Sequence, residues 1–95
     1  MGDDFRYGSI TVPAITFRHV LGTDPRVSEY QVVQTTAGVD ILAVGRPDVD
    51  ALRVSVVAAL RGCGLPDPTV AIRAVDRIPR HQASGKLKRF IALSP

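Results

Sequence analysis

Aromatic residues, cysteine and tryptophan are scarce in this sequence. Aromatic side chains make up 5% of it, tryptophan is absent, and Cys63 is the only cysteine. A lone cysteine excludes an intrachain disulfide and a zinc site built from several cysteines. With so few rings available, the core must consist mainly of valine, leucine, isoleucine and alanine.

Long apolar runs and a strong charge of one sign are missing as well. No stretch approaches the ~18 apolar residues of a membrane-spanning helix, and no secretion signal is visible. We therefore expect a cytoplasmic protein that does not contact membranes. Twelve basic and nine acidic residues give a net charge of +3, and the last third of the chain holds much of the excess. This mild excess argues against a nucleic-acid module and predicts a local basic surface that faces an anion such as a nucleotide.

The length of 95 residues allows one domain with little room for a deep pocket. The two histidines and the acidic residues show no metal-ligand spacing, so no metal site is predicted. No serine–histidine–aspartate or cysteine–histidine set can be placed together. These absences argue against a self-contained enzyme and favour a module that completes a site located elsewhere.

Two helices are predicted from capping and periodicity. Pro13 suits the first turn of a helix over residues 14–21 that Gly22 would end. Asp48 is a good N-cap for a longer helix that carries apolar residues at helical spacing and ends at residues 62–64.

Three strands are predicted from β-branched and alternating residues. Residues 27–35 and 39–45 should form an antiparallel hairpin, and residues 69–75 a third strand. Residues 1–11 indicate an irregular lead-in with a short extended piece at 9–12. This order predicts an α+β fold: a small, three-stranded, largely antiparallel sheet with two helices packed on one face, and a lysine-bearing loop after the last strand.

That loop carries Lys86 directly after Gly85, among small or polar neighbours that suit an exposed segment. A lysine on such a loop can reach a phosphate or carboxylate oxygen, although the same residues also fit a solvated basic tail. A phosphate-binding P-loop is excluded, because Arg80 and Leu87 occupy the positions that need glycine and serine or threonine. Phe90 alternates with Leu87, which indicates a core residue and not a base-stacking one.

The pattern Pro79, Ser84-Gly85-Lys86 and Arg89 resembles the last conserved motif of the adenylate-forming enzymes, which include acyl-CoA ligases, peptide-synthetase adenylation domains and luciferases. Lys86 matches the lysine that contacts the acyl carboxylate and the nucleotide during adenylation in that family. A cation between two approaching anions would lower their repulsion in the transition state.

The resemblance also implies roles for residues around this lysine and at the other end of the chain. Ser84, Gly85, Arg89 and His81 would support the loop or the nucleotide. Asp4, or Asp3, matches the pivot of the family's hinge segment, and Gly8 the glycine that follows it; an acidic pair there also fits a frayed, solvated terminus. On this basis residues 1–12 form a hinge-like lead-in and residues 13–95 a single lid domain.

The resemblance spans essentially the whole chain, and residues 27–33 look most like the phenylacetate–CoA ligase branch. It implies the C-terminal lid of an ATP-dependent acid ligase that forms an acyl-AMP and passes the acyl group to a thiol. ATP, Mg2+ and the thiol of CoA or phosphopantetheine would be bound mainly by a large N-terminal adenylation domain, in cis or in trans. The isolated chain is not expected to be active.

Two alternatives remain open at this level. The chain could be a freestanding, non-catalytic domain of the same fold that binds a partner or carrier protein, or, as a weaker option, a basic nucleic-acid module. His19 and Cys63 are expected to be structural residues near helix ends.

Overall fold

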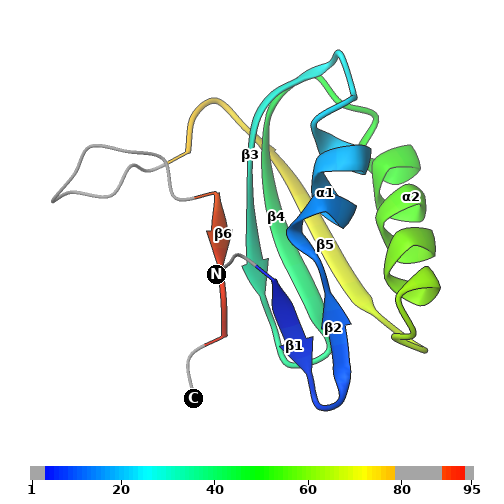
Figure 1. Ribbon diagram of the computed structural model, residues 1–95. Coiled ribbons are helices and arrows are strands. Elements are labelled where there is room, and N and C mark those ends of the chain that lie inside the picture. The colour runs from blue at the N-terminus through cyan, green and yellow to red at the C-terminus, as the bar shows by residue number, and fades with distance from the viewer. Residues whose placement is uncertain (1–3, 79–88, 94–95) are drawn as a thin grey trace, which may run out of the picture.

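The computed structural model describes residues 4–78 and 89–93. Helix α1 spans Ala14–Leu21 and helix α2 spans Val49–Gly62. A four-stranded sheet contains β3 (Val27–Gln34), β4 (Gly38–Gly45), β5 (Thr69–Val75) and β6 (Phe90–Ile91). Strands β1 (Phe5–Tyr7) and β2 (Ile10–Val12) form a separate hairpin (Figure 1).

The α+β class is confirmed, but the prediction of three largely antiparallel strands is wrong. The strand order in the larger sheet is β5-β4-β3-β6; only β3 and β4 are antiparallel, whereas β5 and β6 each run parallel to their neighbour. Strand β5 is parallel because α2 lies between it and β4 in sequence, and a strand–helix–strand crossover returns the chain in the same direction.

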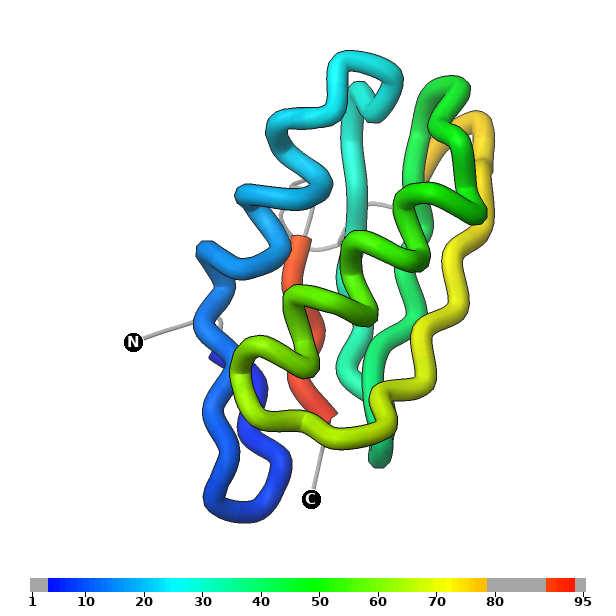
Figure 2. The backbone as a smooth tube through the Cα atoms, turned by 90° about the vertical axis from the view of Figure 1, so that its right-hand side faces the viewer, coloured from blue at the N-terminus to red at the C-terminus, as the bar shows by residue number. Residues whose placement is uncertain are grey.

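Both helices cover the same face of the sheet (Figures 1 and 2), as predicted. Helix α2 turns three leucine and valine side chains at helical spacing towards the sheet, and these are buried: Leu52, Val56 and Leu60. The Asp48 carboxylate caps this helix by accepting a hydrogen bond from the Ala51 N–H at 3.1 Å. The opposite face of the sheet is not covered by either helix.

At the ends of the two helices the structure differs from the prediction in one respect, namely which glycine adopts the left-handed backbone conformation. Gly22 follows α1 in the right-handed region, with φ −74°, and its N–H binds the Arg18 carbonyl at 2.9 Å. The left-handed turn after α2 is made by Gly64 instead, with φ +106°. Cys63 is the C-cap of α2, as expected of a structural residue at that helix end.

The lead-in forms the β1–β2 hairpin: the extended piece expected at residues 9–12 corresponds to β2, whereas the rest was expected to be irregular and contains β1. Phe5, Tyr7, Ile10 and Val12 alternate around the turn at Gly8, where φ is +63° and a glycine is favoured. Phe5 and Val12 are 1% and 0% exposed, so this hairpin belongs to the core of the domain.

Candidate functional site

The sequence-predicted site residues divide between two parts of the chain. Asp3, His81, Ser84, Gly85 and Lys86 lie outside the described residues, and their predicted roles stay predictions. Asp4 and Arg89 are described, and they mark where the hinge-like segment and the end of the lysine loop join the folded domain.

Asp4 binds the N-terminus of α1. Its Oδ1 accepts a hydrogen bond from the Ala14 N–H at 3.1 Å. The N-cap of this helix is Pro13, which makes no side-chain capping bond, so a carboxylate ten positions earlier in the chain takes that function. The positive end of the helix dipole favours the negative charge there. The segment before α1 is thus held against the helix by the residue that sequence reasoning placed at the pivot.

Two further hydrogen bonds hold the β1–β2 hairpin against the sheet. The Tyr7 hydroxyl donates to the Gly38 carbonyl at 2.7 Å, and Gln34 Nε2 donates to the Arg6 carbonyl at 2.6 Å. Burial raises the pKa of the Tyr7 phenol to about 12, because the charged phenolate would lose solvation there. Glycine is required at position 38 for a separate reason, the close approach of β4 to β5, because a Cβ would lie 1.9 Å from the Thr69 carbonyl oxygen.

Arg89 lies immediately before β6 and is fixed by its side chain and its backbone. Its guanidinium lies 4.9 Å from the centroid of the Tyr30 ring, and its carbonyl accepts a hydrogen bond from the Val32 N–H at 2.7 Å. Both contacts are with β3. Arg89 therefore anchors the C-terminal end of the lysine loop to the sheet.

Phe90 follows and is 5% exposed, which confirms it as a core residue. Its ring lies 6.1–6.4 Å, centroid to centroid, from three other rings, those of Phe5, Phe17 and Tyr30. Four of the five aromatic residues in the chain thus meet at one point. They come from β1, α1, β3 and β6, so the hinge-like segment and the strand after the lysine loop share one hydrophobic cluster.

Gln34 links the same two segments through polar contacts, and sequence reasoning missed it. Besides the bond to the Arg6 carbonyl on β1, its Oε1 accepts a hydrogen bond from the Leu93 N–H at 3.0 Å, just after β6. The side chain is 6% exposed. Gln34 continues the inward series of Tyr30 and Val32 on β3, and a glutamine at an inward strand position signals a satisfied buried amide.

His19 and Cys63, which were expected to be structural residues, lie near the ends of the two helices. His19 is exposed, and its backbone carbonyl accepts a hydrogen bond from the Thr23 hydroxyl. Cys63 is half-buried, and its Sγ lies 3.8 Å from Thr16 Oγ1. Within residues 4–78 and 89–93, no three histidine, cysteine or acidic side chains come together as metal ligands. In the same residues, no helix is long and apolar enough to cross a membrane.

Comparison with known proteins adds a likeness of fold. No family model and no curated protein matches the sequence. Among solved structures, the chain is similar to 2-hydroxyisobutyryl-CoA ligase, crystallised in an open conformation in complex with 2-HIB-AMP and CoA. The TM-score is 0.58 at 14% sequence identity, over 98% of this chain and 22% of the ligase chain. The likeness shows a shared fold, and this chain spans about a fifth of the ligase's length.

Proposed function

We propose that this chain is the C-terminal lid domain of an ATP-dependent, adenylate-forming acid ligase. The observation that carries the proposal is the fold similarity, in which almost the whole chain corresponds to 22% of a CoA ligase that was crystallised with an acyl-adenylate and CoA. The motif at residues 79–89 supports it independently, because it places Lys86 where this family has its adenylation lysine.

In this role Lys86 would serve the first half-reaction. The carboxylate of the acid attacks the α-phosphate of ATP, and pyrophosphate leaves as the acyl–phosphate bond forms. Two anions approach each other in this step, and an ammonium group between them stabilises the charge that develops in the transition state. The thiol of CoA or of a phosphopantetheine carrier then takes the acyl group and releases AMP.

The described structure supports a lid that turns as one body. The residues nearest the pivot and those after the lysine loop share the aromatic cluster around Phe90 and the two hydrogen bonds of Gln34. A rotation about Asp4 would therefore carry the base of the lysine loop with it. Such a motion would remove Lys86 after adenylation and present another face of the domain for thioester formation.

The remaining parts of the active site are assigned to a large N-terminal adenylation core, in the same polypeptide or in a separate one. ATP, Mg2+ and the acyl pocket would belong mainly to that core. The acid is proposed to be an aryl acid of the phenylacetate type, on the likeness of residues 27–33. A carrier protein is an alternative to CoA as acceptor.

The test is ATP–pyrophosphate exchange by the adenylation core that accompanies this domain, with the domain present as wild type or as Lys86→Ala. We expect a loss of about 10²–10³-fold for Lys86→Ala. Lys88→Ala, which removes another lysine of the same loop, is the matched control and should retain most of the exchange. Exchange that is equal in the two variants would contradict the role of Lys86. Exchange that does not need the domain at all would favour the freestanding, non-catalytic alternative.

A further inference from the structure

Strand β5 forms an open edge of the larger sheet. Among the described residues it pairs with β4 alone, and Figure 2 shows it along one side of the molecule with no strand or helix beyond it. The Thr69 N–H points towards β4 and donates a hydrogen bond to the carbonyl of Ala37, the residue just before β4, at 3.0 Å. Because backbone groups alternate in direction along a strand, the N–H and C=O groups of Val70, Ile72 and Ala74 point outwards.

This edge lacks the features that keep natural edge strands apart. The sequence of β5 is Thr-Val-Ala-Ile-Arg-Ala-Val, without proline or lysine, and Arg73 is its only charged residue. Its pairing with β4 runs without a bulge from Thr69 to Val75. An exposed, regular and largely apolar edge of this kind is a template for another strand.

We propose that a second copy of this chain pairs with β5, antiparallel and about a two-fold axis through Ile72, so that two four-stranded sheets become one continuous sheet. Only this register pairs all seven residues, from Thr69 against Val75 to Val75 against Thr69 of the second copy. It also sets the outward groups of Val70, Ile72 and Ala74 against the same groups of the other copy, as antiparallel hydrogen bonding requires. The proposal does not depend on the proposed function.

Charge complementarity favours the same register. In the proposed pairing Arg73 lies directly opposite Ala71 of the second copy, and within each chain Ala71 is the register partner of Asp40 on β4. The order across the joined sheet is therefore Asp40, Ala71, then Arg73 of the other copy. The long arginine side chain can lie over the small alanine and meet the carboxylate, and the two-fold axis makes this contact twice.

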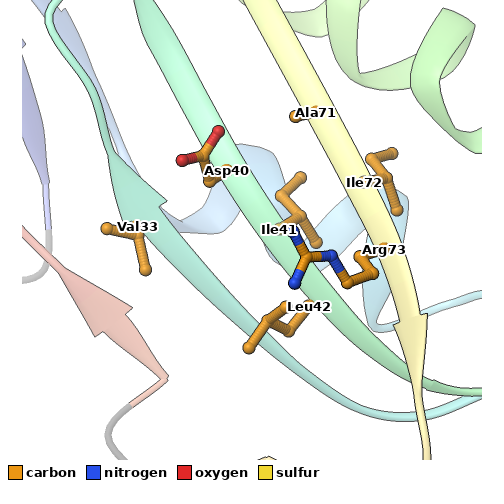
Figure 3. Close-up of a pocket in the computed structure, with 7 residues that line it drawn as sticks. All are labelled: Val33, Asp40, Ile41, Leu42, Ala71, Ile72 and Arg73. Carbon is orange, nitrogen blue, oxygen red and sulfur yellow. The ribbon is translucent and has the colours of Figure 1, made fainter.

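Asp40 and Arg73 lie on the same face of the sheet. In the single chain the Arg73 side chain points across β4 and away from the open edge (Figure 3), so the proposed contact requires another arginine rotamer. Figure 3 shows Asp40 and Arg73 on neighbouring strands, with Ala71 beside Asp40, and the three line one hollow of about 450 Å³ in the sheet. Neither Asp40 nor Arg73 belongs to a salt bridge between described residues. A shift of the register by two residues in one direction would set Arg73 against its own copy, where like charges repel.

Sedimentation equilibrium of the 95-residue chain, over a range of concentrations, tests the proposal. The wild type should reach twice the 10.2 kDa mass of the chain as concentration rises. Asp40→Arg and Arg73→Asp should each raise the dimer Kd about tenfold or more, since each replaces two attractive contacts by repulsive ones. Mixing the two variants should restore dimers, because each arginine then faces an aspartate. Arg6→Asp on the hairpin is the control for charge reversal and should dimerise as the wild type does.

Hydrogen exchange gives a second measurement that does not rely on substitutions. Dimerisation should slow exchange at the Val70, Ile72 and Ala74 amides and leave Ala71 and Arg73, which already face β4, unchanged. A wild type that stays monomeric up to its solubility limit would overturn the proposal. The proposal would also be overturned if mixing the two variants did not restore dimers. Dimerisation that left exchange at Val70, Ile72 and Ala74 unchanged would overturn it as well.

Discussion

The two edges of the sheet are built in opposite ways. At the β6 edge, which we call the closed edge, the outermost strand is only two residues long and is joined to β1 by side chains: four aromatic rings meet there, and Gln34 binds backbone groups of both segments. At the β5 edge nothing in the described part of the chain covers seven residues of regular strand. One edge is short and held by long-range side-chain contacts, and the other presents seven residues of regular strand, where we propose that a second copy pairs.

This difference shows where the fold places its constraints. The closed edge holds the segments that flank the proposed pivot and the proposed lysine loop, so its contacts join the two places through which the proposed lid would transmit motion. The open edge carries none of the predicted site residues. Pairing at β5 would therefore not bury any of those residues in the added strand.

Removal of the Phe90 ring should break the closed edge most strongly. Phe90→Ala removes the side chain at the centre of the aromatic cluster, and we expect a loss of about 3–5 kcal/mol in the free energy of unfolding in urea. Ile91→Ala, next to it on the same strand and only half-buried, is the control and should cost less. Equal losses in the two variants would show that the cluster does not close this edge.

Gln34→Met should loosen the closed edge without removing much volume. The variant leaves the Arg6 carbonyl and the Leu93 N–H without their partner, and we expect a loss of about 1–3 kcal/mol together with faster hydrogen exchange at Leu93. Ser28→Ala removes an exposed hydrogen bond to the Val44 carbonyl on the same pair of strands and should have the smaller effect. An unchanged Leu93 exchange rate would contradict the link between the two segments.

Two substitutions of Asp4 distinguish the stability that comes from capping helix α1 from the stability that comes from the negative charge. Asp4→Ala should lower the free energy of unfolding by about 0.5–2 kcal/mol, because the Ala14 N–H loses its acceptor. Asp4→Asn keeps an acceptor oxygen and should retain most of that stability. Urea titration of both variants checks this, and an asparagine variant as unstable as the alanine one would show that the charge, and not the cap, is what matters.

Tyr7 should give the smallest effect near neutral pH, where Tyr7→Phe loses only the hydrogen bond to the Gly38 carbonyl, and its pH-dependent contribution should appear at high pH. Its pKa rises from 10.0 in the unfolded chain to about 12 in the folded one through burial, so the unfolded state loses its proton first. The stability that Tyr7 contributes is therefore complete below about pH 10 and is lost as the pH rises towards 12. The free energy of unfolding, measured from about pH 9 to about pH 12, should fall more steeply for the wild type than for Tyr7→Phe. Parallel curves would contradict the raised pKa of Tyr7.

Much of the fold followed from the sequence, and the errors have physical causes. The bounds of α1 and β5 and the cap at Asp48 were predicted correctly, because periodicity and capping are local signals. Of the β1–β2 hairpin, the extended piece predicted at residues 9–12 overlaps β2, but β1 was not predicted because a three-residue strand leaves little periodicity to detect. Strand β6 was not predicted, since its two residues pair with β3, far away in sequence. The parallel pairing of β5 was readable from the intervening helix.

The candidate site likewise contains residues that the sequence predicted and contacts that it could not predict. The positions of Asp4 and Arg89 at the two joints came from a motif, but their partners, the Ala14 amide and the Tyr30 ring, lie on other elements and required the fold. Gln34 left only a weak signal, a polar residue in an inward series. Residues whose role is to join distant segments are the ones that a single sequence reveals least.

The measurement that tests the account most directly compares the two half-reactions of the assembled ligase with and without the Lys86 ammonium. Acyl-adenylate formation is followed by pyrophosphate exchange, and thioester formation by consumption of acyl-adenylate that is supplied preformed. The account predicts that Lys86→Ala lowers the first rate about 10²–10³-fold and leaves the second near that of the wild type. An equal loss in both half-reactions, or in neither, would contradict the assignment of this domain as a lid that supplies its lysine to adenylation alone.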